Sequence, residues 1–410
     1  MSGAALERVF RAARGRIVGA LAVRHRSLDM AEDAFAEACA RALQTWPERG
    51  APDDPAAWLY RVADHVAMDG LRRRQTRARL VPEPPPPEPT AEDILTDDRS
   101  IVPDERLRLI LICCHPAIGV DARAALTLRT VCGLSVAEIA RSFLVTEAAL
   151  AQRLVRAKQK IAGAGVPFGL PPPKLWPERL DAVLSTLEVA YSKAHEDAAG
   201  AGPHAGYAAE VLHLTRVLAE LLPDSGEAHA VAATVHYAEA RRPARTDADG
   251  IMIPLADQDP ARWRRELIEQ AHGFMARANE RAPDSPRTLQ AALQAAWCAR
   301  KAFDDPAPWF RVLALYNRLL AVRDDPVVRL NRAVALSHVA GAEAALAEVA
   351  ALDAAQLSGF PPYHAVRAEL CARLGRLAEA RAAYRALLAL DPPPAERRWL
   401  AGKLAALAEG

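Results

Sequence analysis

This 410-residue sequence lacks long apolar runs. It also has few aromatic residues, since only 5% of its residues are Phe, Trp or Tyr. No segment holds the roughly 20 consecutive apolar residues that a membrane-spanning helix needs. The first residues, MSGAALERVFRAARGR, contain no apolar stretch of the kind found in secretory signal peptides. We therefore expect a cytoplasmic protein with no membrane partner. Runs of alternating β-branched residues are also absent, which argues against a β-sheet fold.

Six cysteines are scattered along the chain without metal-type spacing, so we expect reduced thiols. Only Cys113-Cys114-His115-Pro116 suggests a thiol or metal site. Two adjacent cysteines on a helix cannot easily face one ion, and a fourth ligand is missing. We interpret this element as a buried helix end at which Pro116 interrupts the helix. An enzyme built on Cys113, Cys114 and His115 is the alternative, and it predicts an exposed, reactive thiol.

Signatures of catalysis are missing as well: we find no Gly-rich phosphate loop, carboxylate pair or catalytic triad. We therefore predict no catalytic residues, no metal site and no cofactor, and a protein that is not an enzyme. What the sequence does have is Ala and Leu, within an apolar content of 51%. Both residues favour helices, so we predict an all-α protein, long enough for two or three domains.

Charge is segregated along the chain although the net charge is only +1. Residues 1–80 carry 14 Arg and 10 acids, and residues 106–162 carry nine basic residues and three acids. Between them, residues 81–105 carry eight acids and one Arg in a Pro-rich, acidic segment that reads as a stiff linker. The remainder is nearly neutral. This distribution predicts nucleic-acid contact in the first 162 residues only.

Residues 131–161 read as two helices with a short break, the pattern of a helix-turn-helix. Ser135 and Glu138 have capping-box spacing, and Thr146 is a second N-cap. On the second helix an apolar stripe predicts the buried face; it comprises Leu150, Leu154, Ala157 and Ile161. The opposite face offers groups that suit base edges and phosphates in a major groove: Ala149, Gln152, Arg153, Arg156 and Lys160. A solvated surface helix is the alternative.

Upstream, an acidic helix is expected from Asp29 to Thr45, ended by Trp46-Pro47. A further helix starts at Pro55, contains Trp58, and finishes in the arginine-rich run LRRRQTRARL. Cations beside an exposed aromatic ring suit single-stranded DNA, because phosphates pair with the cations and bases stack on the ring. The alternative places Trp58 in the core and leaves the arginines as a solvated helix end.

The segments AEDAFAEACARAL, PAAWLYRVADHVAMDGLRRR, GLSVAEIA and RLVRAKQKI resemble regions 2 and 4 of extracytoplasmic-function sigma factors of the sigma-70 family. The resemblance implies core RNA polymerase and promoter DNA as partners. It implies that the helix carrying Asp29, Glu32, Asp33 and Glu37 docks the clamp of the polymerase. It also implies −35 contacts from helix 147–161 and −10 contacts from Trp58, His65, Arg72, Arg73 and Arg74. At position 65 the family usually has Asn.

The C-terminal half reads as helix pairs of tetratricopeptide type, clearest from Tyr363 to Pro392, with another pair starting at Asp325-Pro326. Such pairs stack into a solenoid whose concave face usually binds a protein partner; a purely structural bundle is the alternative. Residues 241–263 break the rhythm, with a turn at Asp249-Gly250, a short strand at 251–255 and an N-cap at Asp259. We expect their arginines to pair with Asp247 and Asp257, with a ligand pocket as the alternative.

Together these features resemble the sigma-factor subgroup with a C-terminal tetratricopeptide-like extension, which implies a built-in regulatory or protein-interaction domain. The predicted architecture is two small helical sigma domains joined to an α-solenoid. The predicted bounds are 1–80 for region 2, 81–105 for the linker, 106–162 for region 4, 163–175 for a Gly/Pro hinge and 176–410 for the solenoid. The rival hypothesis is a helix-turn-helix regulator with a tetratricopeptide-type sensor that acts without core polymerase.

Overall fold

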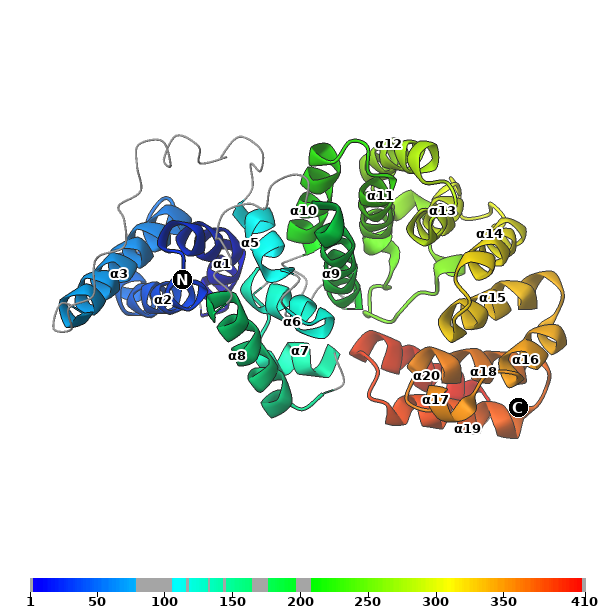
Figure 1. The fold of residues 1–410 in the computed structure, drawn as a ribbon. Helices are drawn as coiled ribbons and strands as arrows, with labels where there is room; N and C mark the ends of the chain where they lie inside the picture. The colour runs from blue at the N-terminus through cyan, green and yellow to red at the C-terminus, as the bar shows by residue number, and fades with distance from the viewer. Residues whose placement is uncertain are drawn as a thin grey trace. The chain divides into compact units, whose positions relative to one another are not determined.

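The computed structural model describes residues 3–78, 105–115, 118–131, 133–142, 145–163, 176–196 and 208–407. Over these ranges the protein is helical, and extended backbone pairs only in an isolated bridge between Thr246 and Met252 (Figure 1). The predicted all-α class is confirmed. None of the described helices combines the length and apolar character needed to cross a bilayer. The predicted linker and hinge lie almost entirely outside the described residues.

The chain divides into two compact units. Unit 1 comprises Met1–Ala194 and Gly206–Leu221, and unit 2 comprises His195–Ala205 and Leu222–Gly410. Unit 1 opens with α1 (Gly3–His25), α2 (Leu28–Arg49) and α3 (Pro55–Ala78), which pack against one another. Ser27 caps α2 by accepting the Met30 N–H at 3.2 Å, and Asp54 caps α3 by accepting the Ala57 N–H at 2.9 Å.

The helix α2 runs past Trp46-Pro47, where the sequence predicted its end. It continues to Arg49, and Gly50 ends it with φ 80° and an N–H that donates to the Trp46 carbonyl at 3.0 Å. Pro47 lies in the last turn, where a missing N–H removes a single backbone bond and leaves the rest of the helix intact. Trp46 is buried and contacts the rings of Phe10 and Trp58, so burial of this indole holds the last turn.

The second part of unit 1 consists of α5 (Glu105–Cys113), α6 (Val120–Thr130), α7 (Val136–Ser142), α8 (Glu147–Gly163), α9 (Trp176–Glu196) and α10 (Ala208–Leu221). The last two helices fall within the predicted solenoid of residues 176–410, and they group with unit 1. The reason is local contact with α5, since Arg179 donates to the Leu111 carbonyl at 3.3 Å and α10 packs against α5.

The two adjacent cysteines lie at the C-terminal end of α5 and are buried. Cys113 Sγ lies 3.4 Å from the hydroxyl of Thr130, and Cys114 Sγ lies 3.9 Å from that of Thr186. Both thiols are fully buried, and burial raises the pKa of Cys113 to about 12 and that of Cys114 to about 11. An enzyme built on these residues would need an exposed, reactive thiol, and that prediction is therefore wrong. Packing in the core explains the two cysteines. Pro116 lies outside the described residues.

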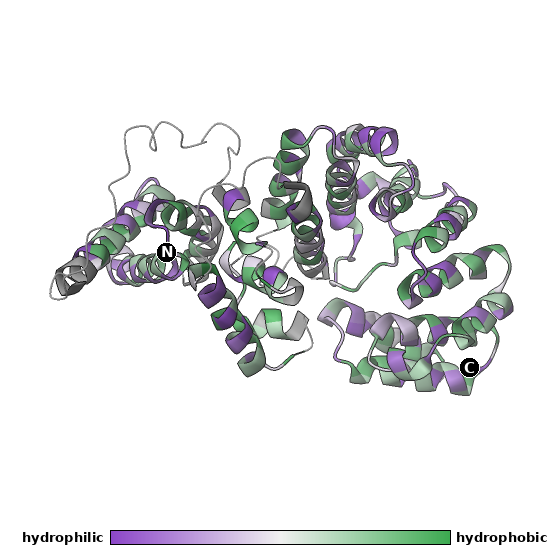
Figure 2. Cartoon of the chain, viewed as in Figure 1, coloured by the Kyte–Doolittle hydropathy of each residue, from purple (hydrophilic) through white to green (hydrophobic). Residues whose placement is uncertain are grey.

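Unit 2 is a succession of helices in which neighbours along the chain pack together (Figure 1). They are α11 (Gly226–Arg241), η3 (Arg242–Ala244), η4 (Leu255–Asp257), η5 (Pro260–Arg262), α12 (Arg265–Arg281), α13 (Pro286–Cys298), α14 (Trp309–Val322), α15 (Pro326–Val339), α16 (Ala342–Ala350), α17 (Ala354–Leu357), α18 (Pro361–Arg373), α19 (Leu377–Ala389) and α20 (Pro394–Ala406). Hydrophobic and hydrophilic residues share most of these helices, as amphipathic packing requires (Figure 2).

The helix pairs predicted from the sequence are present. The turn between α18 and α19 holds Gly375 at φ 72°, and Ala380 and Tyr384 are buried on the second helix of the pair. Tyr384 donates to Glu369 of α18 at 3.2 Å, which ties the pair together at a polar point. Asp325 caps α15 by accepting the Val328 N–H at 2.8 Å, as the Asp-Pro signal predicted.

The segment between α11 and α12 differs in part from its prediction. Gly250 forms the turn with φ 71°, but the predicted short strand is no more than the bridge at Met252. Asp247 accepts the Ile251 N–H at 2.8 Å. The arginines of this segment have partners other than Asp247 and Asp257, the two acids that were expected. Arg242 and Arg264 each lie 3.2 Å from Glu239, a buried acid of α11 that the sequence pattern did not single out.

This segment also joins the two ends of unit 2. The Met252 N–H donates to the Ala395 carbonyl at 3.2 Å, and the Arg398 guanidinium donates to the Asp249 carbonyl at 2.5 Å. Residues more than a hundred positions apart are thereby held together, so the segment acts as a structural tie for α20. A ligand pocket is not needed to explain its charges.

Close packing at the start of α11 generates a stability prediction. A Cβ on Gly226 would lie 2.7 Å from the Ala282 Cβ and 2.9 Å from its backbone nitrogen. Because backbone cannot move away as a flexible side chain can, we expect Gly226→Ala to destabilise unit 2 by about 1–3 kcal/mol in urea unfolding. Gly273→Ala on α12 is the matched control, since nothing lies within 4 Å of its Cβ position. Equal unfolding midpoints for the two variants would contradict this account.

Candidate functional site

The acidic side chains of α2 separate into two groups. Asp33 and Glu37 are exposed, and Glu37 pairs with Arg41 of its own helix at 2.8 Å. Glu32 is largely buried, with 13% of its side chain exposed, and its carboxylate accepts from Arg14 of α1 at 2.7 Å. Asp29 is exposed and pairs with Lys158 at 3.2 Å. The four acids expected at one polymerase-binding face thus have different surroundings.

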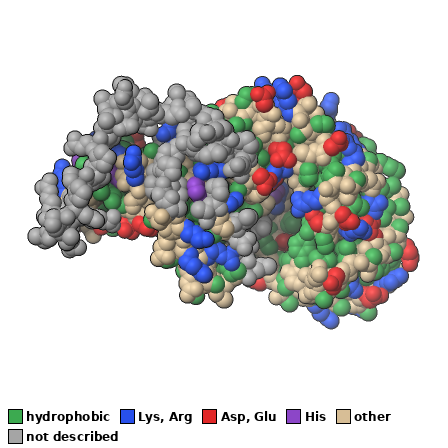
Figure 3. Space-filling model, in the orientation of Figure 1, with side chains coloured by type: hydrophobic (Ala, Val, Ile, Leu, Met, Phe, Trp, Pro, Cys, Tyr) green, Lys and Arg blue, Asp and Glu red, His purple; other side chains and the backbone are tan. Residues whose placement is uncertain are grey.

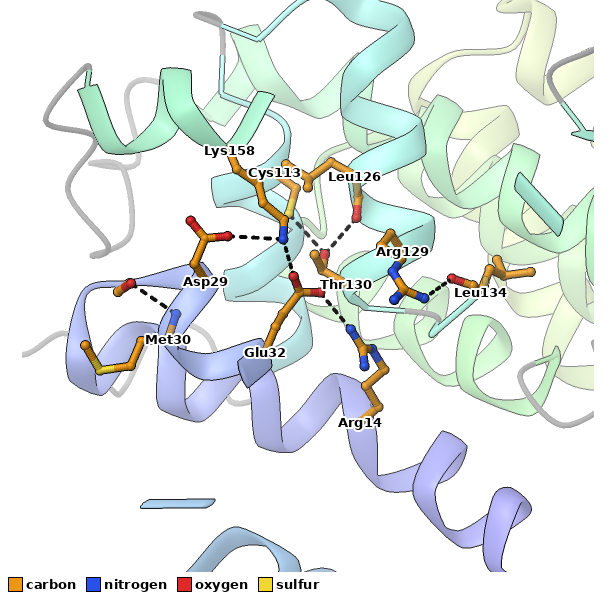
Figure 4. A network of polar contacts seen from close by, with 11 residues as sticks. Arg14, Asp29, Met30, Glu32, Cys113, Leu126, Arg129, Thr130, Leu134 and Lys158 are labelled. Atoms are coloured by element: carbon orange, nitrogen blue, oxygen red, sulfur yellow. Dashed lines mark hydrogen bonds and ion pairs between the residues drawn. The ribbon is translucent and has the colours of Figure 1, made fainter. Parts of the chain in front are cut away.

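Lys158, from α8, contacts two acids of α2, the enclosed Glu32 and the exposed Asp29. Its ammonium group donates to Glu32 Oε2 and lies 3.2 Å from Asp29 Oδ1 (Figure 4). Burial lowers the pKa of Lys158, but the hydrogen bonds and charges of Glu32 and Asp29 outweigh this effect and hold the pKa above its ordinary value. Burial also lowers the pKa of Arg14, against the opposing charge of Glu32. Two cations thus share one buried carboxylate.

The sequence prediction did not include Lys158 or Arg14 in any site. Lys158 comes four residues after Leu154 and three before Ile161, both buried, so it borders the inner face of its helix. That spacing was the available signal. Its partners could not be identified, because Glu32 is 126 residues away along the chain.

The helix α8 has the arrangement that its sequence predicted. Leu150, Leu154, Ala157 and Ile161 are buried, and Thr146 caps the helix by accepting the Ala149 N–H at 3.2 Å. Of the predicted DNA-binding residues, Ala149, Gln152, Arg156 and Lys160 are exposed and Arg153 is half-buried. Lys and Arg side chains gather on the visible face of unit 1 around this helix (Figure 3). The side chain of Glu138, expected in the capping box, lies outside the described residues.

The turn before α7 is fixed by α6. Arg129 donates to the Leu134 carbonyl at 2.9 Å (Figure 4). The Leu134 N–H donates to the Leu128 carbonyl at 3.1 Å. The helix α8 packs against both α6 and α7. Two helices, α6 and α7, therefore hold α8 as a preformed element with one polar side outward, which is the geometry needed for insertion into a groove.

On α3, the residues predicted for single-stranded DNA have different exposures. Trp58 is half-buried, and its ring centroid lies 5.3 Å from that of Trp46 in an edge-on arrangement, so part of it belongs to the core. His65 is exposed. Arg72 is exposed and lies 3.6 Å from Asp69 one turn earlier. Arg73 and Arg74 belong to the last turns of α3, but their side chains lie outside the described residues.

Titratable and ligand-forming groups give no sign of a metal centre. Among the described residues, no group of three or more His, Cys, Asp or Glu side chains is placed to hold a metal ion. The buried polar side chains of the described residues include members of ion pairs, such as Glu32 with Arg14, and of bonds to other side chains, such as Tyr237 with His272. What this arrangement can do is bind: α2 and α8 present charges of opposite sign on well-packed helices.

Comparison with known families divides the chain in the same order as its helices. Residues 6–77 match Sigma-70 region 2, residues 108–161 match Sigma-70 region 4, and residues 179–279 match a family of unknown function, DUF6596. An uncharacterized protein of Rhizobium meliloti (strain 1021) is 39% identical over 405 residues, which cover 97% of this chain and 94% of that protein. No solved structure gives a significant match.

Proposed function

We propose that this chain, which belongs to the sigma-70 family as an extracytoplasmic-function-like sigma factor with a C-terminal extension, binds core RNA polymerase through α2 and promoter DNA through α3 and α8. The observation that carries the proposal is the match of regions 2 and 4, in order, within one chain. A sigma factor serves promoter recognition at initiation, while nucleotide chemistry belongs to the core enzyme. A regulator acting without polymerase would not need residues 28–74, and the region 2 match disfavours it.

For the −35 element, the outward side of α8 supplies the contacts. Gln152 and Arg153 lie in its N-terminal half, where amide and guanidinium groups can bond base edges in the major groove. Arg156 and Lys160 lie further along the helix and suit phosphates, which fix register but carry no sequence information. Ala149 is small and exposed near the capped end, so it permits close approach of the helix to a base or its methyl group.

For the −10 element, α3 supplies exposed His65 and Arg72, followed by Arg73 and Arg74. Phosphates of a melted strand would pair with the arginines, and a base would stack on the accessible part of Trp58. His65 offers one donor and one acceptor on a ring, where an amide would offer both on one planar group, so base selection at this position follows imidazole geometry. The exposure of His65 and Arg72 and the positive charge of the arginines support the proposed −10 contacts.

For core polymerase, Asp33 and Glu37 are the best placed of the four acids. They are exposed, one turn apart, and on the same side of α2. Asp29 and Glu32 belong to the same proposed surface but have Lys158 as an internal partner. Cations on the polymerase clamp would therefore meet Asp33 and Glu37 first.

For the C-terminal extension, we propose regulation or binding of a protein partner on the helix pairs of unit 2. Stacked helix pairs of this kind leave an extended surface that suits proteins. Its charges are nearly balanced in sequence, in contrast to the two basic blocks that precede it.

Substitutions on α8 test the −35 contacts. We expect Arg153→Ala to cost about 1–3 kcal/mol in promoter affinity and to relax base preference at one −35 position, because a base contact is lost. Lys160→Ala should weaken binding to all promoters alike, because a phosphate contact is lost. Runoff transcription by the holoenzyme on a library of −35 sequences measures both. An unchanged base preference for Arg153→Ala would refute the proposed docking.

Charge reversal on α2 tests polymerase binding. Asp33→Lys combined with Glu37→Lys should abolish co-purification with core polymerase, because like charges would then face each other across the interface. The melting temperature should stay nearly unchanged, since exposed acids contribute little to folding. Glu48→Lys, at another exposed acid of α2, is the control and should retain binding. If the double variant binds core polymerase as tightly as the parent, α2 is not the docking helix.

Removal of unit 2 tests the role of the extension. A chain ended after Leu221 keeps α9 and α10, which pack within unit 1. We expect this chain to recognise the same promoter sequences but to support less runoff transcription than the full chain, because the extension assists rather than reads DNA. Identical transcription and core affinity for the two chains would show that the extension is an independent appendage.

A further inference from the structure

Aromatic residues, which are scarce in the chain as a whole, gather at one place in unit 2. They make up 5% of the sequence, yet five of them lie between residues 297 and 316: Trp297, Phe303, Trp309, Phe310 and Tyr316. Phe303 is 64% exposed and Phe310 is 78% exposed. Contiguous exposed apolar groups mark contact surfaces, and aromatic residues are enriched in the cores of protein interfaces. Packing therefore explains the buried members of this group but not the two exposed rings.

The loop between α13 and α14, which carries Phe303, is fixed from within by a buried arginine. Arg300 is 5% exposed, and its guanidinium donates to the Phe303 carbonyl at 2.9 Å and the Asp305 carbonyl at 3.1 Å. It also donates to the Ala256 carbonyl at 3.0 Å. The Asp305 carboxylate in turn accepts the Lys301 N–H at 2.6 Å. Because the loop is already ordered, a partner that covers Phe303 would lose little affinity to loop ordering.

Phe310 stands on a helix start that is also well fixed. The helix α14 packs against both α13 and α15 (Figure 1). The Trp309 ring stacks on the His338 ring of α15, with centroids 3.9 Å apart and planes at 1°. It also meets the Trp297 ring of α13 edge-on, at a centroid distance of 4.9 Å. These contacts hold the first turn of α14 from both sides, with Phe310 next to Trp309 and exposed.

The outward side of α14 is apolar, with cations beside it. Ala314 and Ala321 are exposed and follow Phe310 by four and eleven residues, so the three positions lie along one helix face. The helix contains arginines and no acid. Among the described residues, no carboxylate forms an ion pair with Arg311 of this helix or with Lys301 of the loop. We call this area the α14 surface; it comprises Lys301, Phe303, Phe310, Arg311, Ala314 and Ala321.

Charge decides between a second copy of the chain and a different partner. A twofold contact between two copies brings the same patch together with itself. The arginines of two α14 helices would then face each other, with no acid on either helix. The loop adds one exposed acid, Asp304, which offsets only one of the two cations Lys301 and Arg311. A partner that carries carboxylates beside apolar side chains complements the surface better.

We propose that the α14 surface docks an acidic amphipathic segment of a partner protein. Its apolar side chains cover Phe303 and Phe310, and its carboxylates pair with Lys301 and Arg311. This inference rests on the proposed binding of a protein partner by unit 2, and it adds the place and the chemistry of that partner. The aromatic rings supply most of the affinity, whereas the exposed ion pairs contribute less and orient the segment.

Peptide selection on the full-length chain tests this docking. The probe is a displayed library of peptides of about 20 residues, long enough for several helical turns. Each position holds Leu, Ala, Glu or Lys at random, so acidic and basic amphipathic sequences are equally represented. Peptides that also bind the Phe310→Ser variant are removed, which discards those held by the basic surfaces of unit 1. The melting temperature of this variant should match that of the parent, because the replaced ring is exposed.

Two further variants that take no part in the selection are then measured with the retained peptides. Phe303→Ser removes the second exposed ring of the surface. Leu43→Ser is the matched control, since it removes a side chain that is 52% exposed from α2, far along the chain. The double variant Lys301→Glu with Arg311→Glu reverses both cations. It is measured with each peptide and with a version of that peptide in which Lys replaces every Glu.

We expect the retained peptides to be rich in Leu and Glu and to bind the Leu43→Ser variant as they bind the parent. Phe303→Ser should weaken binding about 10-fold or more, because an aromatic contact at the centre of the interface is lost. Reversal of both cations should weaken binding about 3- to 10-fold, as expected for exposed ion pairs. The Lys version of the peptide should regain affinity for the reversed variant, because complementary charge is restored.

The opposite outcomes separate the α14 surface from its proposed occupant. Retained peptides rich in Lys, or an unchanged affinity after charge reversal, would overturn the acidic partner. Self-association of the parent, or its binding to a single-stranded oligonucleotide, would overturn it too if Phe310→Ser abolished that contact. If no peptide is retained while removal of unit 2 still lowers runoff transcription, the α14 surface falls and the proposed role of the extension stands. If removal of unit 2 has no effect either, both fall.

Discussion

The described helices bury Ala and Leu side chains against their neighbours, in a stripe on α8 and on nearly all sides of α11. In unit 2 the contact of α11 with α12 shows the consequence: Ala233 and Tyr237 meet Ile268 and Ala271, and all four are buried. Small side chains bring helix backbones close, so little space is left for uncompensated polar groups. Where a charge enters the packed interior, as Arg241 does, it bonds a neighbour such as Gln294.

This requirement for partners explains the ionic cluster of unit 1. Glu32 lies on a helix face that region 4 covers, and a bare carboxylate there would be costly. Arg14 comes from the same bundle as Glu32, whereas Lys158 comes from α8, among the region 4 helices. The enclosed carboxylate therefore has two cationic partners, one from its own bundle and one from α8.

Local patterns predicted the helices that have clear periodicity and caps in the sequence, because periodicity and caps act within a few residues. The buried face of α8, its Thr146 cap and the α18–α19 pair all follow from spacing alone. The end of α2 was misplaced, because tertiary burial of Trp46 outweighs the local signal of Pro47. The partners of Arg242 and Lys158 could not be predicted, since such pairs depend on helices brought together by folding and not on spacing in sequence.

The four acids of α2 illustrate how one helix can serve two contacts. Asp29, Asp33 and Glu37 are spaced by four residues and lie along one side of the helix, whereas Glu32 is turned toward the neighbouring side. Asp33 and Glu37 are exposed, Glu32 is enclosed, and Asp29 stands at the boundary with Lys158 as its partner. A cation arriving at the exposed side would therefore reach Asp29 before Glu32.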